Sequence, residues 1–161
     1  MKRKKKLFSR PRKAFESSRI AEENVLVKKY GLKNKKEIWK TLAKLDYFRK
    51  RAMALARADS GEQEVFLNKL KEIGINVSSI SDVLGLKVEN LLDRRISSIL
   101  FDKKLASTTK QARQMIVHKR VQVGDCIVNA PSYFMPVALE NKILIRESKP
   151  KKEKEIKEEA Q

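Results

Sequence analysis

The sequence predicts an α+β protein, in which a helical N-terminal domain precedes a small α/β domain of two helices packed on a short antiparallel sheet. Two observations predict this class. Apolar residues recur with the period of a helix from about residue 18 to residue 118, and they then alternate with the period of two that strands show. A chain of 161 residues suffices for one medium domain or two small ones.

Residues 1–15 form a basic arm that we expect to be disordered. This segment has no acidic side chain, and Pro11 disfavours a helix there. Its charge comes from Lys2, Arg3, Lys4, Lys5, Lys6, Arg10, Arg12 and Lys13. Basic arms of this kind commonly become ordered on nucleic acid, so the arm is a candidate RNA contact.

The helical domain is expected over residues 16–87. Its first helix runs from about Ser18 to Tyr30, and Gly31 is the predicted C-terminal stop. A second helix begins after Asn34, with Glu37 completing a capping-box pattern. The apolar stripe of this helix is Ile38, Leu42, Leu45, Phe48, Ala52 and Leu55, and its other face carries Lys36, Lys40, Lys44, Arg49, Lys50, Arg51 and Arg57.

A third helix opens with Ser60 and Gln63 in a second capping-box pattern, and Gly74 ends it. Its apolar stripe is Phe66, Leu70 and Ile73. A polar link and one helical turn over residues 82–86 follow, and we place the domain boundary between residues 87 and 88.

The second domain is expected over residues 88–147. A helix from Val88 to Phe101 leads through a loop, residues 103–107, to a helix spanning about Thr109 to His118. Thr108 is its predicted N-cap, with Gln111 reaching back. Strands are expected at 121–123, 126–128 and 142–145, with a turn at 124–125. Residues 148–161 form a charged tail that we expect to be disordered.

The charge balance favours a polyanionic partner. The chain has 38 Lys and Arg against 20 Asp and Glu, a formal net charge of +18, and nucleic acid relieves the resulting self-repulsion. No run approaches the ~20 apolar residues that cross a bilayer, and no secretory signal is expected. Cys126 is the only cysteine and His118 the only histidine, so we expect a buried Cys126 and no disulfide, metal or other cofactor.

The N-terminus of the helix after Thr108 is the predicted RNA-binding centre. Its backbone N–H groups and positive dipole favour phosphate, and Lys110 and Arg113 lie beside it. Arg94 and Arg95 are expected to project onto the same side from the preceding helix. Such a surface holds folded RNA by shape and charge, because the deep major groove of RNA resists readout.

This stretch resembles the alpha-L RNA-binding motif. The residues that carry the resemblance are 92–95 (Leu-Asp-Arg-Arg), 105–108 (Leu-Ala-Ser-Thr) and 110–118 (Lys-Gln-Ala-Arg-Gln-Met-Ile-Val-His). Residues 30–40 and 131–133 extend it, so that residues 22–145 resemble the S-four family of small-subunit ribosomal proteins in its archaeal form. Two places depart from the family pattern: Lys119 replaces a small residue, and Gly124-Asp125-Cys126 replaces a basic hairpin turn.

The resemblance implies a structural constituent of the small ribosomal subunit that binds rRNA early in assembly and supports translational accuracy. Its implied partners are small-subunit rRNA, neighbouring ribosomal proteins and mRNA where it enters the subunit, with no membrane and no homo-oligomer, in the cytoplasm. The candidate RNA-binding residues are Arg94, Arg95, Lys103, Lys104, Thr108, Lys110, Gln111, Arg113, Gln114, His118, Lys119, Arg120, Lys4, Lys5, Arg10, Arg12, Lys36, Lys40, Arg49 and Arg51.

Three alternative functions can be compared with this one. An RNA-modifying enzyme is disfavoured, because the chain has no room for a catalytic domain and its candidate acids, Asp46, Asp82 and Asp93, occur singly. A stress protein with a lone alpha-L domain is disfavoured by the preceding helices. A ribosome-assembly factor of the same fold, binding precursor rRNA, stays open.

Overall fold

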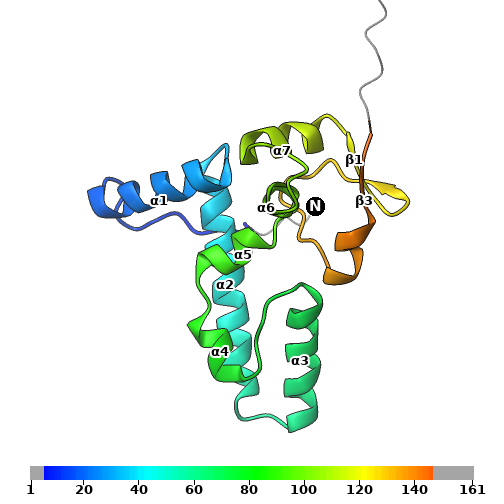
Figure 1. Ribbon diagram of the computed structural model, residues 1–161. Helices are drawn as coiled ribbons and strands as arrows, with labels where there is room; N and C mark the ends of the chain where they lie inside the picture. The colour runs from blue at the N-terminus through cyan, green and yellow to red at the C-terminus, as the bar shows by residue number, and fades with distance from the viewer. Residues whose placement is uncertain (1–5, 147–161) are drawn as a thin grey trace, which may run out of the picture.

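The computed structural model describes residues 6–146 and confirms the α+β class (Figure 1). The predicted charged tail and the first five residues of the basic arm lie outside the described residues. In chain order the elements are α1 (Ser17–Tyr30), α2 (Lys35–Leu55), α3 (Ser60–Glu72), α4 (Ile80–Gly85), α5 (Val88–Asp93), α6 (Ile96–Asp102), α7 (Thr109–Val117), β1 (Val121–Val123), β2 (Cys126–Ile127), the 3₁₀ helix η1 (Val137–Lys142) and β3 (Ile143–Ile145).

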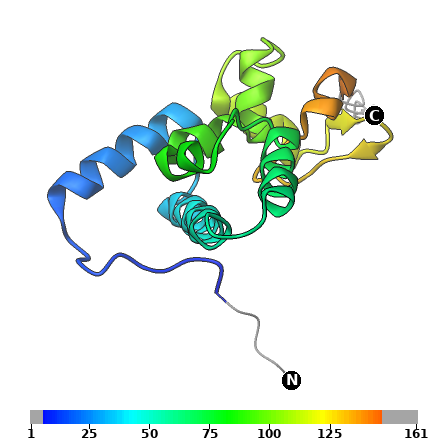
Figure 2. The same ribbon diagram turned by 90° about the horizontal axis from the view of Figure 1, so that it is seen from below.

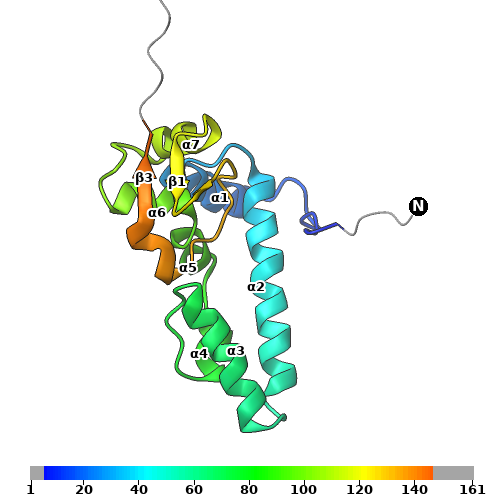
Figure 3. The ribbon, with the colours of Figure 1, turned by 90° about the vertical axis from the view of Figure 1, so that its right-hand side faces the viewer.

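Helix α2 is the long element that runs past both parts of the protein (Figure 3). Along its C-terminal half it packs against α3 and α4, and the buried cluster there includes Leu45, Phe48, Leu70, Val83 and Leu91. A smaller cluster, with Tyr30 and Ile38 at its centre, joins α1, α2 and α5. We call residues 17–93 the helical module. Residues 6–15 leave the start of α1 and run back toward α2 without forming a helix (Figure 2), and Phe8 lies against Trp39 near the start of α2.

The prediction of one continuous helix from Val88 to Phe101 is wrong, because the helix is interrupted at Arg94 and Arg95. Arg95 has an extended backbone and forms an antiparallel bridge with Phe134. The Met135 N–H donates to the Arg94 carbonyl at 3.1 Å, and the Ile96 N–H donates to the Tyr133 carbonyl at 3.0 Å. The Arg94 carbonyl and the Ile96 N–H, which would bond within a continuous helix, therefore bond to residues 133–135 instead.

Residues 94–146 form the sheet module. Helices α6 and α7 pack on a three-stranded antiparallel sheet of order β2-β1-β3, in which Gln122 pairs with both Ile127 and Leu144. Ile96, Leu100, Ile116 and Val121 are fully buried in its core. Buried side chains change from the helical to the sheet cluster between Leu92 and Ile96; the boundary at residues 87–88 stays a prediction.

The glycine stops were predicted correctly. Gly31 follows α1 with φ +59° and Gly74 follows α3 with φ +86°, a region that favours glycine. Both glycines also lie against neighbours: a Cβ on Gly31 would be 2.9 Å from Thr109 Oγ1, and one on Gly74 would overlap the Arg94 guanidinium. The two turns therefore bring the helical module against the sheet module.

The observed N-caps of α2 and α3 differ from the predicted capping boxes. The Asn34 side chain makes no capping bond, because the Glu37 backbone N–H donates to the Asn34 main-chain carbonyl at 3.0 Å. The Glu37 carboxylate accepts the Lys33 N–H at 3.3 Å rather than that of Asn34. Asp59 rather than Ser60 is the N-cap of α3. The Gln63 amide donates to the Leu55 and Ala58 carbonyls instead of reaching back along α3.

Two predicted core residues are exposed. Cys126 lies in β2, the two-residue edge strand of a hairpin that projects away from the helices (Figure 1), so nothing covers it. Leu42, in the predicted stripe of α2, keeps 38% of its surface exposed, whereas Ile38, Leu45, Phe48 and Ala52 are buried.

Candidate nucleic-acid interface

The start of α7 is capped as predicted. The extended Thr108 places its side-chain oxygen to accept the Gln111 backbone N–H at 3.1 Å. The Gln111 Oε1 atom reaches back and accepts the Ser107 N–H at 2.9 Å. These bonds fix where the helix begins, and its positive dipole end therefore lies next to Lys110.

Cationic side chains surround α7 on the surface. Lys104, Lys110 and Lys119 are exposed, as are Gln114 and His118, and Arg120 is partly exposed. None of the four cations has an ion-pair partner in the part of the chain that the structure describes. Lys103 is also exposed, but its ammonium donates to Asn141 Oδ1 at 3.1 Å and to the Glu140 carbonyl.

Lys104 and Lys119 occupy unusual backbone conformations. Their φ angles are +58° and +59°, and each follows the C-cap of a helix, α6 and α7 respectively. A side chain in this left-handed region costs about 1–2 kcal/mol relative to the right-handed one. Glycine would avoid this cost at position 119, so the backbone does not explain why this chain has Lys119 where the family pattern has a small residue.

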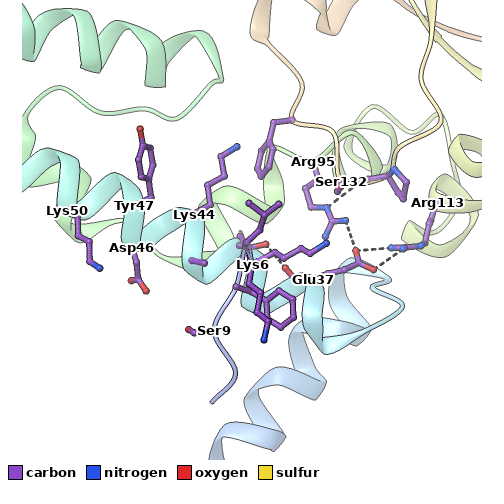
Figure 4. A pocket seen from close by; sticks show the side chains of 17 residues that line it. Lys6, Ser9, Glu37, Lys44, Asp46, Tyr47, Lys50, Arg95, Arg113 and Ser132 are labelled. Atoms are coloured by element: carbon purple, nitrogen blue, oxygen red, sulfur yellow. Dashed lines mark hydrogen bonds and ion pairs between the residues drawn. The ribbon is translucent and has the colours of Figure 1, made fainter. Parts of the chain in front are cut away.

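Arg95 and Arg113 do not project into solvent as expected. Arg95 is only 3% exposed, and its NH2 lies 2.6 Å from Glu37 Oε2. Arg113 binds the same carboxylate with two contacts, at 2.8 Å and 3.1 Å (Figure 4). We call Glu37, Arg95 and Arg113 the Glu37 cluster. It connects α2 of the helical module to the N-cap of α6 and to the middle of α7.

Arg94 is also engaged within the protein. Its Nε donates to the Ile73 carbonyl at 2.7 Å, and its NH2 donates to the Met135 carbonyl at 3.1 Å and to the Glu140 carboxylate. The predicted projection of Arg94 and Arg95 is therefore wrong, because both guanidinium groups turn inward between the modules.

Glu37 is the residue whose role sequence reasoning missed. Burial acts to raise the pKa of its carboxyl, but hydrogen bonds and charge interactions with Arg113 and Arg95 outweigh burial and lower the pKa to about 2. The carboxylate stays ionised at neutral pH and holds two arginines at once. A signal was present: Glu37 is an acid at the start of a helix whose polar face is otherwise almost entirely basic.

The other candidate residues separate into three groups. Lys36, Lys40, Arg51, Arg10 and Arg12 are exposed. Arg49 is partly buried and donates to the Leu86 carbonyl at 2.7 Å, so it connects α2 to the segment after α4. Lys4 and Lys5 lie outside the described residues.

A pocket of about 1010 Å³ lies along α2, and we call it the α2 pocket (Figure 4). Residues 6–9 of the arm form part of its lining, α2 contributes residues between Glu37 and Lys50, and the rest includes Pro131, Ser132 and Phe134. Arg95 and Arg113 also line it, so the pocket reaches the Glu37 cluster. Lys44, Tyr47 and Phe134 are pocket residues that are not among the candidate RNA-binding residues chosen from the sequence.

Two of the three isolated acids, Asp82 and Asp93, have structural partners. Asp82 caps α4: hydrogen bonds from Ser78 and Ser79 lower the pKa of its carboxyl to about 2. Asp93 accepts the Tyr30 hydroxyl at 2.7 Å. Within residues 6–146, no group of three or more His, Cys, Asp or Glu side chains could hold a metal ion. Nor is any helix in that range long and apolar enough to cross a membrane.

Comparison with known proteins gives two kinds of match. The model of the S4 domain family matches residues 94–135, which begin at the break between α5 and α6. The chain is also similar over most of its length to archaeal proteins named small ribosomal subunit protein uS4. Identity is 38% with that of Natronomonas pharaonis, covering 90% of this chain and 88% of the relative. Identity with the protein of Methanococcus aeolicus is 40%, covering 86% of this chain and 82% of the relative. Identity with the protein of Halobacterium salinarum is 37%, covering 89% of this chain and 86% of the relative.

Proposed function

This chain belongs to the family of small ribosomal subunit protein uS4. We propose that it is a structural, RNA-binding constituent of the small subunit and that it binds rRNA through the cations around α7. The surface in question comprises Lys104, Lys110, His118, Lys119 and Arg120, which we call the α7 surface. Arg94, Arg95 and Arg113 support it from inside rather than contact RNA directly.

The observation that carries this proposal is the charge left without partners. The lysines of the α7 surface are exposed and Arg120 is partly exposed, and none of these cations has an ion pair within residues 6–146. Arg94, Arg95 and Arg113, in contrast, are all paired. Phosphate contacts of this kind position a folded RNA by charge and shape, without reading its sequence. The left-handed backbone at Lys104 and Lys119 adds to this, since strain of that kind gathers at functional sites.

A binding experiment tests the α7 surface. Affinity of the full-length protein for small-subunit rRNA is measured over a range of salt concentrations, for the wild type and for Lys110→Ala. Removing one cation that neutralises a phosphate lowers the log–log salt slope by about 0.9 on a duplex and about 0.7 on single strands. Lys69→Ala, an exposed lysine of α3 without an ion pair within residues 6–146, is the matched control. Equal slopes for Lys110→Ala and the wild type would refute the surface assignment.

The finer aspects of the proposal follow from family membership. They are binding of rRNA at an early stage of assembly, support of translational accuracy, contact with neighbouring subunit proteins and with incoming mRNA, a cytoplasmic location, and action without catalysis, cofactor or self-association. The structure of the chain fits a role in which α2 braces an RNA-binding sheet module through the Glu37 cluster.

Sedimentation of a cell lysate separates this role from that of an assembly factor. The protein is followed by immunoblot across a sucrose gradient at low and moderate salt. We expect it in mature small subunits and translating ribosomes at both salt concentrations. Recovery from precursor particles alone would replace a structural role with a transient one.

A further inference from the structure

The α2 pocket carries more positive charge than its own acids neutralise. Six cationic side chains line it, against two acidic ones, which leaves an excess of four positive charges. Glu37 is occupied by two arginines, and only Asp46 remains for the lysines. The cations are Lys6, Lys40, Lys44, Lys50, Arg95 and Arg113.

Lys44 is the cation most in need of an anion. Its side chain is half-buried, and its ammonium lies 3.5 Å from the centre of the Phe134 ring. Burial lowers the pKa of this ammonium, and no carboxylate lies within ion-pair distance of it in residues 6–146. A cation–π contact offsets part of the cost of removing the charge from water. An anion entering the pocket would offset more.

Aromatic side chains lie next to this unpaired cation. Tyr47 is one turn along α2 from Lys44 and points to the same side of the helix, whereas Asp46 and Lys50 point to the other side (Figure 4). The Tyr47 side chain is 55% exposed, although it is large and partly apolar. Phe134 and Phe8 also line the pocket. Flat rings beside a basic groove are the combination on which single-stranded nucleic acid stacks its bases.

The size and position of the pocket fit a nucleotide that belongs to a longer chain. A volume of about 1010 Å³ lies at the upper end of pockets that hold small ligands, about 300–1,000 Å³. Arg113 of α7 lines the pocket, so the pocket reaches the helix that carries the α7 surface, although no residue of that surface lines it. An acidic peptide would satisfy Lys44 but would offer no flat base to the rings.

We propose that the α2 pocket binds an unpaired nucleotide of the RNA held by the α7 surface, with a phosphate near Lys44 and the base against the exposed Tyr47 ring. This inference rests on the proposed RNA-binding function and adds to it a site for single-stranded RNA. The base must be unpaired, because a duplex does not release its bases to a stacking ring.

The test uses the full-length protein and a short single-stranded RNA that carries 2-aminopurine, whose fluorescence falls when the base stacks. We expect binding with quenching. Lys44→Met keeps the apolar stem and removes the charge, and we expect it to weaken affinity about fivefold or more and to lower the salt slope by about 0.7. Tyr47→Leu removes the ring at an exposed position and should abolish most of the quenching, since stacking of one base accounts for about fivefold or more in affinity.

Matched variants make the result specific. Tyr47→Phe retains the ring and should quench like the wild type, and Lys69→Met removes a lysine from α3, far from the pocket lining, and should bind like the wild type. Circular dichroism verifies folding of each variant. If Lys44→Met does not fold, the Tyr47 pair decides the question alone.

The outcomes distinguish this inference from the proposed function. Wild-type binding to rRNA, with oligonucleotide binding and quenching unchanged in Lys44→Met and Tyr47→Leu, would overturn the pocket site and leave the α7 surface standing. Absence of rRNA binding by the wild type would overturn both. Two competitors test the occupant. If polyglutamate displaces the oligonucleotide, and this displacement requires Lys44 but not Tyr47, the occupant is an acidic protein segment. Equally tight binding of adenosine monophosphate would indicate a free nucleotide instead.

Discussion

Replacing Glu37 by glutamine tests how strongly the Glu37 cluster joins the two modules. The change keeps the shape of the side chain but removes the charge that faces Arg95 and Arg113. Arg95 is 3% exposed at its side chain and Glu37 is 18% exposed, so the arginine cannot recover its hydration by a small movement. It would remain a buried charge without a counter-charge.

The magnitude follows from the pKa of the Glu37 carboxyl. A fall from 4.5 to about 2 corresponds to about 3 kcal/mol of folding free energy, at about 1.4 kcal/mol per pH unit. Removal of one partner of a buried pair costs about 3–5 kcal/mol in general. We therefore expect Glu37→Gln to lower the free energy of unfolding by about 3 kcal/mol and the Tm by about 6–12 °C.

The stability that Glu37 contributes should fall as the pH is lowered. Because the folded-state pKa is depressed, the contribution of Glu37 is fully present above about pH 4.5 and is lost as the pH falls through about 2. The stability difference between wild type and Glu37→Gln should therefore shrink over this interval. Urea unfolding followed by circular dichroism measures both proteins, with Glu64→Gln, an exposed glutamate of α3, as control. A difference below about 1 kcal/mol at neutral pH, or one that does not change with pH, would refute the reasoning.

Three further variants test other parts of the structure. Thr108→Ala removes the oxygen that accepts the Gln111 N–H, and urea unfolding should show a loss of about 1 kcal/mol; an unchanged midpoint would mean that the cap does not stabilise α7. Gly31→Ala meets both a φ of +59° and the Thr109 hydroxyl, so it should cost more than about 1 kcal/mol by thermal unfolding, and a neutral outcome would contradict the close packing at this turn. Leu100→Ala leaves a cavity in the sheet-module core and should cost about 2–5 kcal/mol in urea; a smaller cost would mean that the core collapses around the site.

Local signals in the sequence predicted local structure well. The stop at Gly31, the cap at Thr108 and the change from helical to strand periodicity after residue 118 all depend on neighbours within a few positions. The apolar spacing of α2 likewise identified most of its buried face, although Leu42 is exposed and Leu55 only partly buried. These features required no knowledge of distant contacts.

Contacts between distant segments account for what the sequence did not predict. The break between α5 and α6 arises because Arg95 pairs with Phe134, which lies far along the chain. Glu37 was interpreted as a local cap, but its partners lie 58 and 76 residues away. The expectation that Arg94 and Arg95 project was wrong, because residue type does not indicate whether a guanidinium faces solvent or a carboxylate of another element.

The inward-facing arginines also bear on how selective the protein is for its RNA. A fragment that began at Arg94, where the matched family domain starts, would retain Arg95 and Arg113 but lack Glu37. Both guanidinium groups would then lack their carboxylate partner, and each could bind a phosphate through two parallel hydrogen bonds. Such a fragment would adhere more readily to any RNA. We therefore expect the helical module to limit non-specific RNA binding, because Glu37 occupies both guanidinium groups.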